Sequence, residues 1–131
     1  MKKIILMLVL TVMSNVANAA WNSIGEFKVG ERQAEQYIDP DFVRNGDVIT
    51  VMSLINYHSP SQSSSVNSQV SKAEFNCSES LRRWTYAISY KGNMATGDSY
   101  NAEVISDARG AWKPVTPHTS GEAMFKIVCR R

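Results

Sequence analysis

The chain has 131 residues, a length that suits one domain with a single hydrophobic core. Its 14 Lys and Arg against 12 Asp and Glu give a formal net charge of +2, but Lys2 and Lys3 lie in a segment that we expect to be removed. The remaining 12 basic and 12 acidic residues balance. Charge therefore gives no support to nucleic-acid binding, and we expect no nucleic-acid partner.

The N-terminal segment has the pattern of a cleavable signal peptide. Lys2 and Lys3 precede an almost unbroken apolar run over residues 4–13, and Ala17-Asn18-Ala19 forms an A-x-A cleavage site. This run is too short for a membrane anchor, which needs about 20 residues. No cysteine lies near the cut to accept a lipid, and no later stretch is long and apolar enough to be transmembrane. We expect residues 1–19 to be removed and residues 20–131 to form a single exported domain.

The first half of the mature chain predicts strands separated by turns. Residues 21–36 predict an initial strand followed by a turn, and residues 37–40 a short strand that ends at Pro40, which has no N–H to donate. Asn and Gly at positions 45–46 predict the next turn. Residues 48–57 (VITVMSLINY) are apolar on both faces, which predicts a central strand covered on both sides.

The second half begins with a serine-rich segment over residues 58–69, which predicts a mobile loop. Residues 70–77 alternate with period two and predict a half-buried strand. A further strand is expected over residues 84–90, then a turn at 91–93 and a strand over 100–105. In the strand over residues 84–90, the alternation places four large side chains on one face: Trp84, Tyr86, Ile88 and Tyr90.

The C-terminal segment predicts a helix. Thr119 precedes Glu122 by three residues, which is the spacing of a capping box. An apolar stripe follows, made of Ala123, Met124, Ile127 and Val128. Arg130 and Arg131 are expected in the last turn, where positive charge complements the helix dipole.

The two cysteines, Cys77 and Cys129, lie 52 positions apart. In an exported chain, an even number of cysteines predicts a disulfide. By the chain-entropy model, this bond would raise the free energy of unfolding by about 4 kcal/mol. A metal pair would need more ligands, and a redox pair would favour C-x-x-C. Cys77 shares a strand face with Phe75, and Cys129 lies on the apolar helix face. The sequence therefore predicts an α+β domain of about five or six antiparallel strands, with a C-terminal helix tied to one face by the disulfide.

Catalytic and metal sites find little support. The only histidines, His58 and His118, lie in loop segments, and the serines cluster in a segment without a G-x-S-x-G motif. A triad needs rigidly held partners, and a two-histidine metal site needs a third ligand. We therefore expect no enzyme, no cofactor and no metal ligands.

Three residues are candidates for contact with a partner. Arg82 and Arg83 combine two charges next to an aromatic residue, and Trp21 stands at the start of the mature chain, where it is a candidate interface anchor. The alternative is that the two arginines form a solvated strand entrance with Trp84 in the core. Trp112 is expected to pack against the sheet.

Short motifs spread over residues 21–129 resemble the surface-adhesin protein E family of diderm bacteria. The order and spacing of these motifs, with both cysteines in place, carry the resemblance. They are Trp21-x-x-Ile24-Gly25, Tyr37-Ile38-Asp39, Arg44-Asn45-Gly46, Leu54-Ile55-Asn56-Tyr57 before Pro60, Glu74-Phe75-Asn76-Cys77 followed by Arg83, Tyr90-Lys91-Gly92-Asn93-Met94-Ala95-Thr96-Gly97, Trp112-Lys113-Pro114-Val115-x-Pro117, and Glu122 with Ile127-Val128-Cys129.

The resemblance implies an antiparallel sheet with a C-terminal helix tied to it by a disulfide. It also implies a non-enzymatic outer-surface protein that binds host matrix and serum proteins such as vitronectin, laminin and plasminogen. Two features depart from the founding adhesin. This chain has no lipobox cysteine, and residues 63–71, which match the vitronectin-binding stretch, carry no basic residue before Lys72.

Two functions follow as expectations. The first is a non-catalytic envelope protein, periplasmic or at the cell surface or secreted, that binds a host matrix or envelope protein. The second is a periplasmic ligand-binding, inhibitory or envelope-accessory module without adhesin activity.

Overall fold

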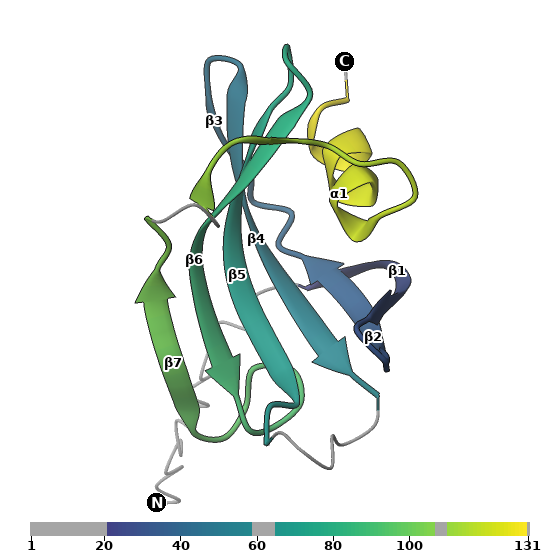
Figure 1. Ribbon diagram of the computed structural model, residues 1–131, viewed down its shortest axis with the longest axis vertical. Coiled ribbons are helices and arrows are strands. Elements are labelled where there is room, and N and C mark those ends of the chain that lie inside the picture. Colours follow the sequence, from purple (N-terminus) through teal and green to yellow (C-terminus); the bar gives the residue numbers. More distant parts are fainter. Residues whose placement is uncertain (1–20, 59–64, 107–109, 131) are drawn as a thin grey trace, which may run out of the picture.

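A single antiparallel sheet with one helix on it forms the domain (Figure 1). The computed structural model describes residues 21–58, 65–106 and 110–130, so the predicted signal peptide lies outside the described residues. The elements are β1 (Asn22–Val29), β2 (Arg32–Ile38), β3 (Val43–Asn45), β4 (Val48–Tyr57), β5 (Ser68–Asn76), β6 (Leu81–Tyr90), β7 (Ser99–Val104), β8 (Lys113–Pro114) and α1 (Ser120–Val128).

The sheet has eight strands, more than the five or six expected from the sequence. Its main path runs β1-β2-β4-β5-β6-β7, while β3 pairs with β4 and β8 pairs with β6. The initial strand and turn predicted within residues 21–36 are present as β1 and the turn at Gly30 (φ +62°), but the chain already returns as β2 from Arg32. Residues 37–38, predicted as a separate strand, are the end of β2. The turn predicted at Asn45-Gly46 is confirmed, and it joins β3 to β4.

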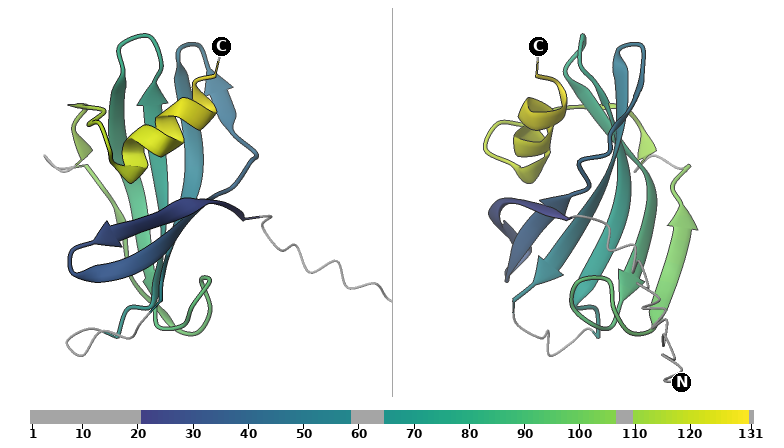
Figure 2. Two further views of the ribbon diagram at one scale, coloured as in Figure 1. Left: turned by 90° about the vertical axis from the view of Figure 1, so that its right-hand side faces the viewer. Right: turned by 180° about the vertical axis from the view of Figure 1, so that it is seen from behind.

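The two faces of the sheet differ in what covers them. Both α1 and the β1–β2 hairpin cross one face of the long strands β4–β6 (Figure 2, left). We call this the inner face, and the opposite one the outer face. The cluster of buried side chains on the inner face consists of Ile38, Ile49, Val51, Ala73, Phe75, Met124 and Val128. Side-chain alternation along β4 and β5 thus places the core under the helix.

A bulge in β6 changes which side chains share a face. Trp84 is the cross-strand partner of Ala73, whereas Tyr86 is the partner of Lys72, so Thr85 is an extra residue in β6. Ala73 and Lys72 are neighbours in β5 and point to opposite faces. The prediction that Trp84 and Tyr86 share one face is therefore wrong: Trp84 lies on the inner face and Tyr86 on the outer.

The helix begins where its cap predicts. Thr119 is the N-cap, and its Oγ1 accepts a hydrogen bond from the Glu122 N–H at 3.2 Å. Met124 and Val128 are buried against the sheet. The helix is short and ends at Val128, so Arg130 lies beyond its last turn, where Lys126 stands instead. It is not long and apolar enough to cross a membrane, and no other α-helix occurs among the described residues.

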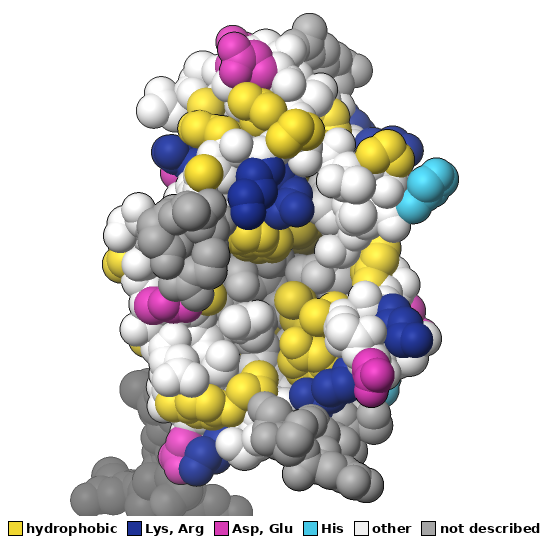
Figure 3. Space-filling model, in the orientation of Figure 1, with side chains coloured by type: hydrophobic (Ala, Val, Ile, Leu, Met, Phe, Trp, Pro, Cys, Tyr) yellow, Lys and Arg dark blue, Asp and Glu magenta, His cyan; other side chains and the backbone are white. Residues whose placement is uncertain are grey.

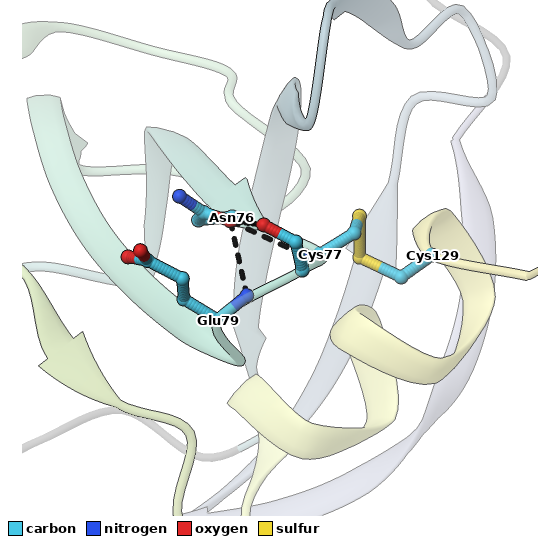
Figure 4. The surroundings of a disulfide bond; sticks show 5 residues. Asn76, Cys77, Glu79 and Cys129 are labelled. Atoms are coloured by element: carbon cyan, nitrogen blue, oxygen red, sulfur yellow. Dashed lines mark hydrogen bonds between the residues drawn. A yellow bond between two sulfur atoms is a disulfide. The ribbon is translucent and has the colours of Figure 1, made fainter.

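The predicted disulfide between Cys77 and Cys129 is present, with Cα atoms 5.5 Å apart. Cys129 is the C-cap of α1, and Cys77 follows directly after β5. Beside it, the Asn76 side chain accepts hydrogen bonds from the backbone N–H groups of Ser78 and Glu79 (Figure 4). The turn after β5 is thereby fixed, and the disulfide ties the end of the helix to it.

Candidate functional site

The inner face carries a cavity of about 340 Å³. Its lining comes from β4, β5, β6, β7 and the residue after β7: Ile55, Gln69, Ser71, Trp84, Ala87, Glu103 and Ile105. Figure 3 shows a hollow in the middle of this view, bordered by hydrophobic side chains and with basic side chains above it. The wall is mainly aliphatic and aromatic, with two neutral polar side chains and one carboxylate.

Polar side chains are buried beside this cavity. Gln36, Ser53, Ser71 and Ser89 all lie on the inner face and are 8% exposed or less. Ser53 is directly opposite Ser71, and Gln36 is directly opposite Ile55, so both adjoin lining residues. Such a polar row is unusual in a sheet core, where the inward positions are normally apolar.

Two of these side chains have no hydrogen-bonding partner in the part of the chain that the structure describes. They are Gln36, through Nε2, and Ser53, through Oγ. Their exposed fractions are 2% and 0%. A buried hydrogen-bond donor without a partner lowers the free energy of unfolding by about 1–3 kcal/mol. Folding therefore places two destabilising groups next to the cavity.

The outer face carries a stack of charge on an aromatic ring. The guanidinium of Arg83 lies 4.4 Å from the centroid of the Trp112 ring, and one of its terminal nitrogens lies 3.0 Å from a carboxylate oxygen of Glu74. Glu74 and Arg83 are cross-strand partners in β5 and β6. The strand register therefore holds the arginine, and Trp112 covers it.

A third group of titratable side chains forms where Glu26 of β1 and Glu35 of β2 meet His58, the residue after β4. One ligand atom from each of Glu26, Glu35 and His58 lies within 4.8 Å of the others, and these are residue types that bind metal ions. Each of the three side chains also has a hydrogen-bonding partner within the protein. His58 Nε2 lies 2.8 Å from a carboxylate oxygen of Glu26, and the His58 N–H donates to the Gln33 carbonyl of β2.

Glu35 in this cluster is stabilised as a carboxylate. The hydroxyl of Ser23 donates to one of its oxygens at 2.6 Å, and the hydroxyl of Tyr37 donates to the other at 2.6 Å. These two hydrogen bonds lower the pKa of Glu35 below its usual range. The same interaction, chiefly the hydrogen bond to Glu35, raises the pKa of Tyr37 to about 12.

The structure separates the predicted partner contacts. Arg82 and Arg83 are neighbours in β6 and therefore point to opposite faces, Arg82 toward Gly121 of α1 and Arg83 toward Trp112. Trp21 is partly exposed just before β1. These three residues do not form one patch.

Sequence reasoning missed the cavity and the hairpin cluster. Both bring together residues from strands far apart in the chain, such as Glu26 and His58 or Ile55 and Glu103. One signal was available: Gln36, Ser53 and Ser71 are polar residues at inward positions of strands, where the pattern calls for apolar ones.

Comparison with known proteins gives one family and one set of similar structures. The family model described as surface-adhesin protein E matches residues 21–130. Crystal form II of Haemophilus influenzae protein E is similar with a TM-score of 0.55 at 16% identity, covering 72% of this chain and 79% of that one. The selenomethionine form of the same protein has a TM-score of 0.55 at 15% identity, covering 80% and 85%. At this identity, the likeness shows the fold. No curated protein sequence matches.

Proposed function

Because this chain belongs to the surface-adhesin protein E family, we propose that it is a non-enzymatic exported envelope protein that binds a host matrix or serum protein. The observation that carries the proposal is the family match, which spans residues 21–130 and so takes in nearly all of the expected mature domain. The protein is adhesin-like by family and by fold. We propose in addition the class of its partner, the surface that binds this partner and the cell compartment.

The Arg83–Trp112 stack is the surface we propose for the partner. Arginine and tryptophan are the residue types that most often dominate protein interfaces. Here the pair is held by Glu74 and the strand register, so it loses little conformational freedom when a partner binds. Val104 adds an apolar side chain, 77% exposed, on the outer face of neighbouring β7.

Arg82 and Trp21 remain proposed partner contacts, but with less structural support than Arg83 and Trp112. A partner seated on the outer face cannot also reach Arg82, which points to the inner face. Separate Arg82→Ala and Arg83→Ala variants therefore decide which face is used.

Cell location is the first test of the proposal. Intact cells that carry the tagged protein are treated with protease, and the periplasm and the medium are then fractionated. Removal by protease or release into the medium supports host-protein binding. Protection until the outer membrane is opened contradicts it and favours the periplasmic module.

Direct binding is the second test. Purified protein is measured against immobilised vitronectin and laminin, and we expect Trp112→Ala and Arg83→Ala to weaken binding by about thirty-fold each, the size of an interface hot spot. Lys28→Ala, an exposed basic residue of β1, is the matched control and should bind normally. Equal binding by all variants would rule out the outer face as the surface that binds the partner.

A further inference from the structure

Three side chains of metal-binding types meet beside the β1–β2 hairpin. Glu26 and Glu35 are directly opposite each other in β1 and β2, and His58 follows β4. One ligand atom from each lies within 4.8 Å of the other two. In a tetrahedral zinc site, bonds of about 2.0–2.2 Å place the ligand atoms roughly 3.4 Å apart. The fold thus supplies the further ligands whose absence led us to expect no metal site from the sequence.

We propose that Glu26, Glu35 and His58 bind a zinc ion, each through one ligand atom, with the fourth coordination position open to water. Like charges directly opposite each other destabilise an antiparallel pair of strands, and the register places two carboxylates in that relation. A cation between them replaces this repulsion by attraction. One imidazole nitrogen with two carboxylate oxygens suits zinc, whereas calcium and magnesium take oxygen ligands.

Neighbouring groups hold two of the three ligands in position. The backbone N–H of His58 donates to the Gln33 carbonyl at 3.1 Å, which keeps the histidine beside β2. The hydroxyls of Ser23 and Tyr37 donate to the two carboxylate oxygens of Glu35, each at 2.6 Å. A carboxylate oxygen has two acceptor sites, so each oxygen keeps one for a metal ion. Metal-binding carboxylates are commonly hydrogen-bonded in this way, because the outer partners orient them.

Zinc binding exchanges one hydrogen bond for two metal–ligand bonds. His58 Nε2 lies 2.8 Å from a carboxylate oxygen of Glu26. To bind zinc through Nε2, the neutral ring carries its proton on Nδ1. The side chains of Glu26 and His58 are 63% and 41% exposed, so both have room to rotate from the hydrogen bond to the ion.

Calorimetry with zinc tests the site directly. The mature chain is purified without a histidine tag, treated with EDTA, dialysed and titrated with zinc chloride, and calcium and magnesium chloride are titrated in parallel. We expect one zinc ion per chain. Calcium and magnesium should bind at least about tenfold more weakly, since both prefer sites made of oxygen ligands. Zinc should also raise the melting temperature, because it binds the folded chain.

Three variants each remove one ligand. Glu26→Gln, Glu35→Gln and His58→Gln should each weaken zinc binding by about tenfold or more, since losing even an outer partner of a ligand costs this much. Melting temperatures without zinc show that each variant is folded. Two matched controls should bind zinc as the parent does. Glu31→Gln is exposed in the turn between β1 and β2, and His118→Asn changes the other histidine at a positive φ that asparagine tolerates.

Nitrogen NMR of the histidine rings identifies the ligand atom. The chain has two histidines, so His118→Asn assigns the signals, and zinc should shift Nε2 of His58 alone. The proposal is overturned if zinc does not saturate the chain at submillimolar concentration, or if it shifts only His118. It is also overturned if His58→Gln and Glu35→Gln bind zinc as tightly as the parent protein. Arg83→Ala should leave zinc binding unchanged, so the result is separate from the outcome for the host-protein partner.

Discussion

Trp84 and Tyr86 stand two positions apart in β6, yet their side chains lie on opposite faces of the sheet. The extra residue between them, Thr85, shifts the register against β5. Trp84 therefore packs beside the inner core and lines the cavity, while Tyr86 lies on the outer face.

This difference predicts unequal costs of truncation. Trp84→Ala removes contacts with the core and should lower the free energy of unfolding by about 2–4 kcal/mol, somewhat less than for a fully buried tryptophan. Tyr86→Ala should cost about 1 kcal/mol, since its side chain faces outward. Urea denaturation of both variants measures the difference. Equal losses would show that the two residues share one environment.

Reduction of the disulfide should destabilise the fold. The bond between Cys77 and Cys129 closes a long loop and joins the helix end to the sheet, so its removal should cost about 2–4 kcal/mol. Thermal melts of the parent protein and of the Cys77→Ser/Cys129→Ser double variant, each with and without reductant, measure this. Only the parent should respond to reductant. An unchanged melting temperature in the double variant would show that the bond contributes nothing.

Met124 and Val128 are the two side chains of α1 in the core cluster, and Met124 is the larger. It is fully buried, so Met124→Ala should lower the free energy of unfolding by about 2–5 kcal/mol through lost burial and a residual cavity. Met124→Leu keeps the volume and should cost less than about 1.5 kcal/mol. Lys126→Ala on the exposed side of the helix is the control. If Met124→Ala were as stable as Lys126→Ala, the burial of Met124 would not contribute to the stability of the fold.

The pKa of Glu35 should depend on the two hydroxyl groups that donate hydrogen bonds to it. Its pKa is lowered in the folded protein, so its contribution to stability is present above the unfolded pKa and is lost as pH falls through the folded pKa. Ser23→Ala removes the largest cause and should raise the pKa toward the usual range, more than Tyr37→Phe does. Carbon NMR titration of the Glu35 carboxyl group reads this directly, and no response to either variant would contradict the hydrogen bonds.

Tyr37 gives the complementary prediction at high pH. Its pKa is raised to about 12, so the stabilising effect of its protonated hydroxyl is present below the unfolded pKa and is lost as pH rises through about 12. Tyrosine ionisation is followed by ultraviolet absorbance as the pH is raised. In the parent protein, one tyrosine should lose its proton only near pH 12. In the Glu35→Gln variant, that late step should move to lower pH.

Local patterns in the sequence were enough to predict several of the strands, one turn and the helix. Alternation over residues 70–77, the Asn45-Gly46 turn and the cap at Thr119 each depend on a few neighbouring residues, and each occurs in the structure as predicted. The even count of two cysteines, in a chain expected to be exported, was likewise enough to predict their bond, which is present. The family resemblance read from spaced motifs is confirmed by the match over residues 21–130.

Only the tertiary structure decided which side chains meet. The bulge at Thr85 depends on pairing with β5, and it alone sends Trp84 inward. The stack of Arg83 on Trp112 joins residues 29 positions apart, and the cavity gathers side chains from four strands. Local sequence determines periodicity and caps because these depend on adjacent residues. Register, bulges and cavities depend on how distant strands align, and that alignment is fixed only when the whole sheet packs.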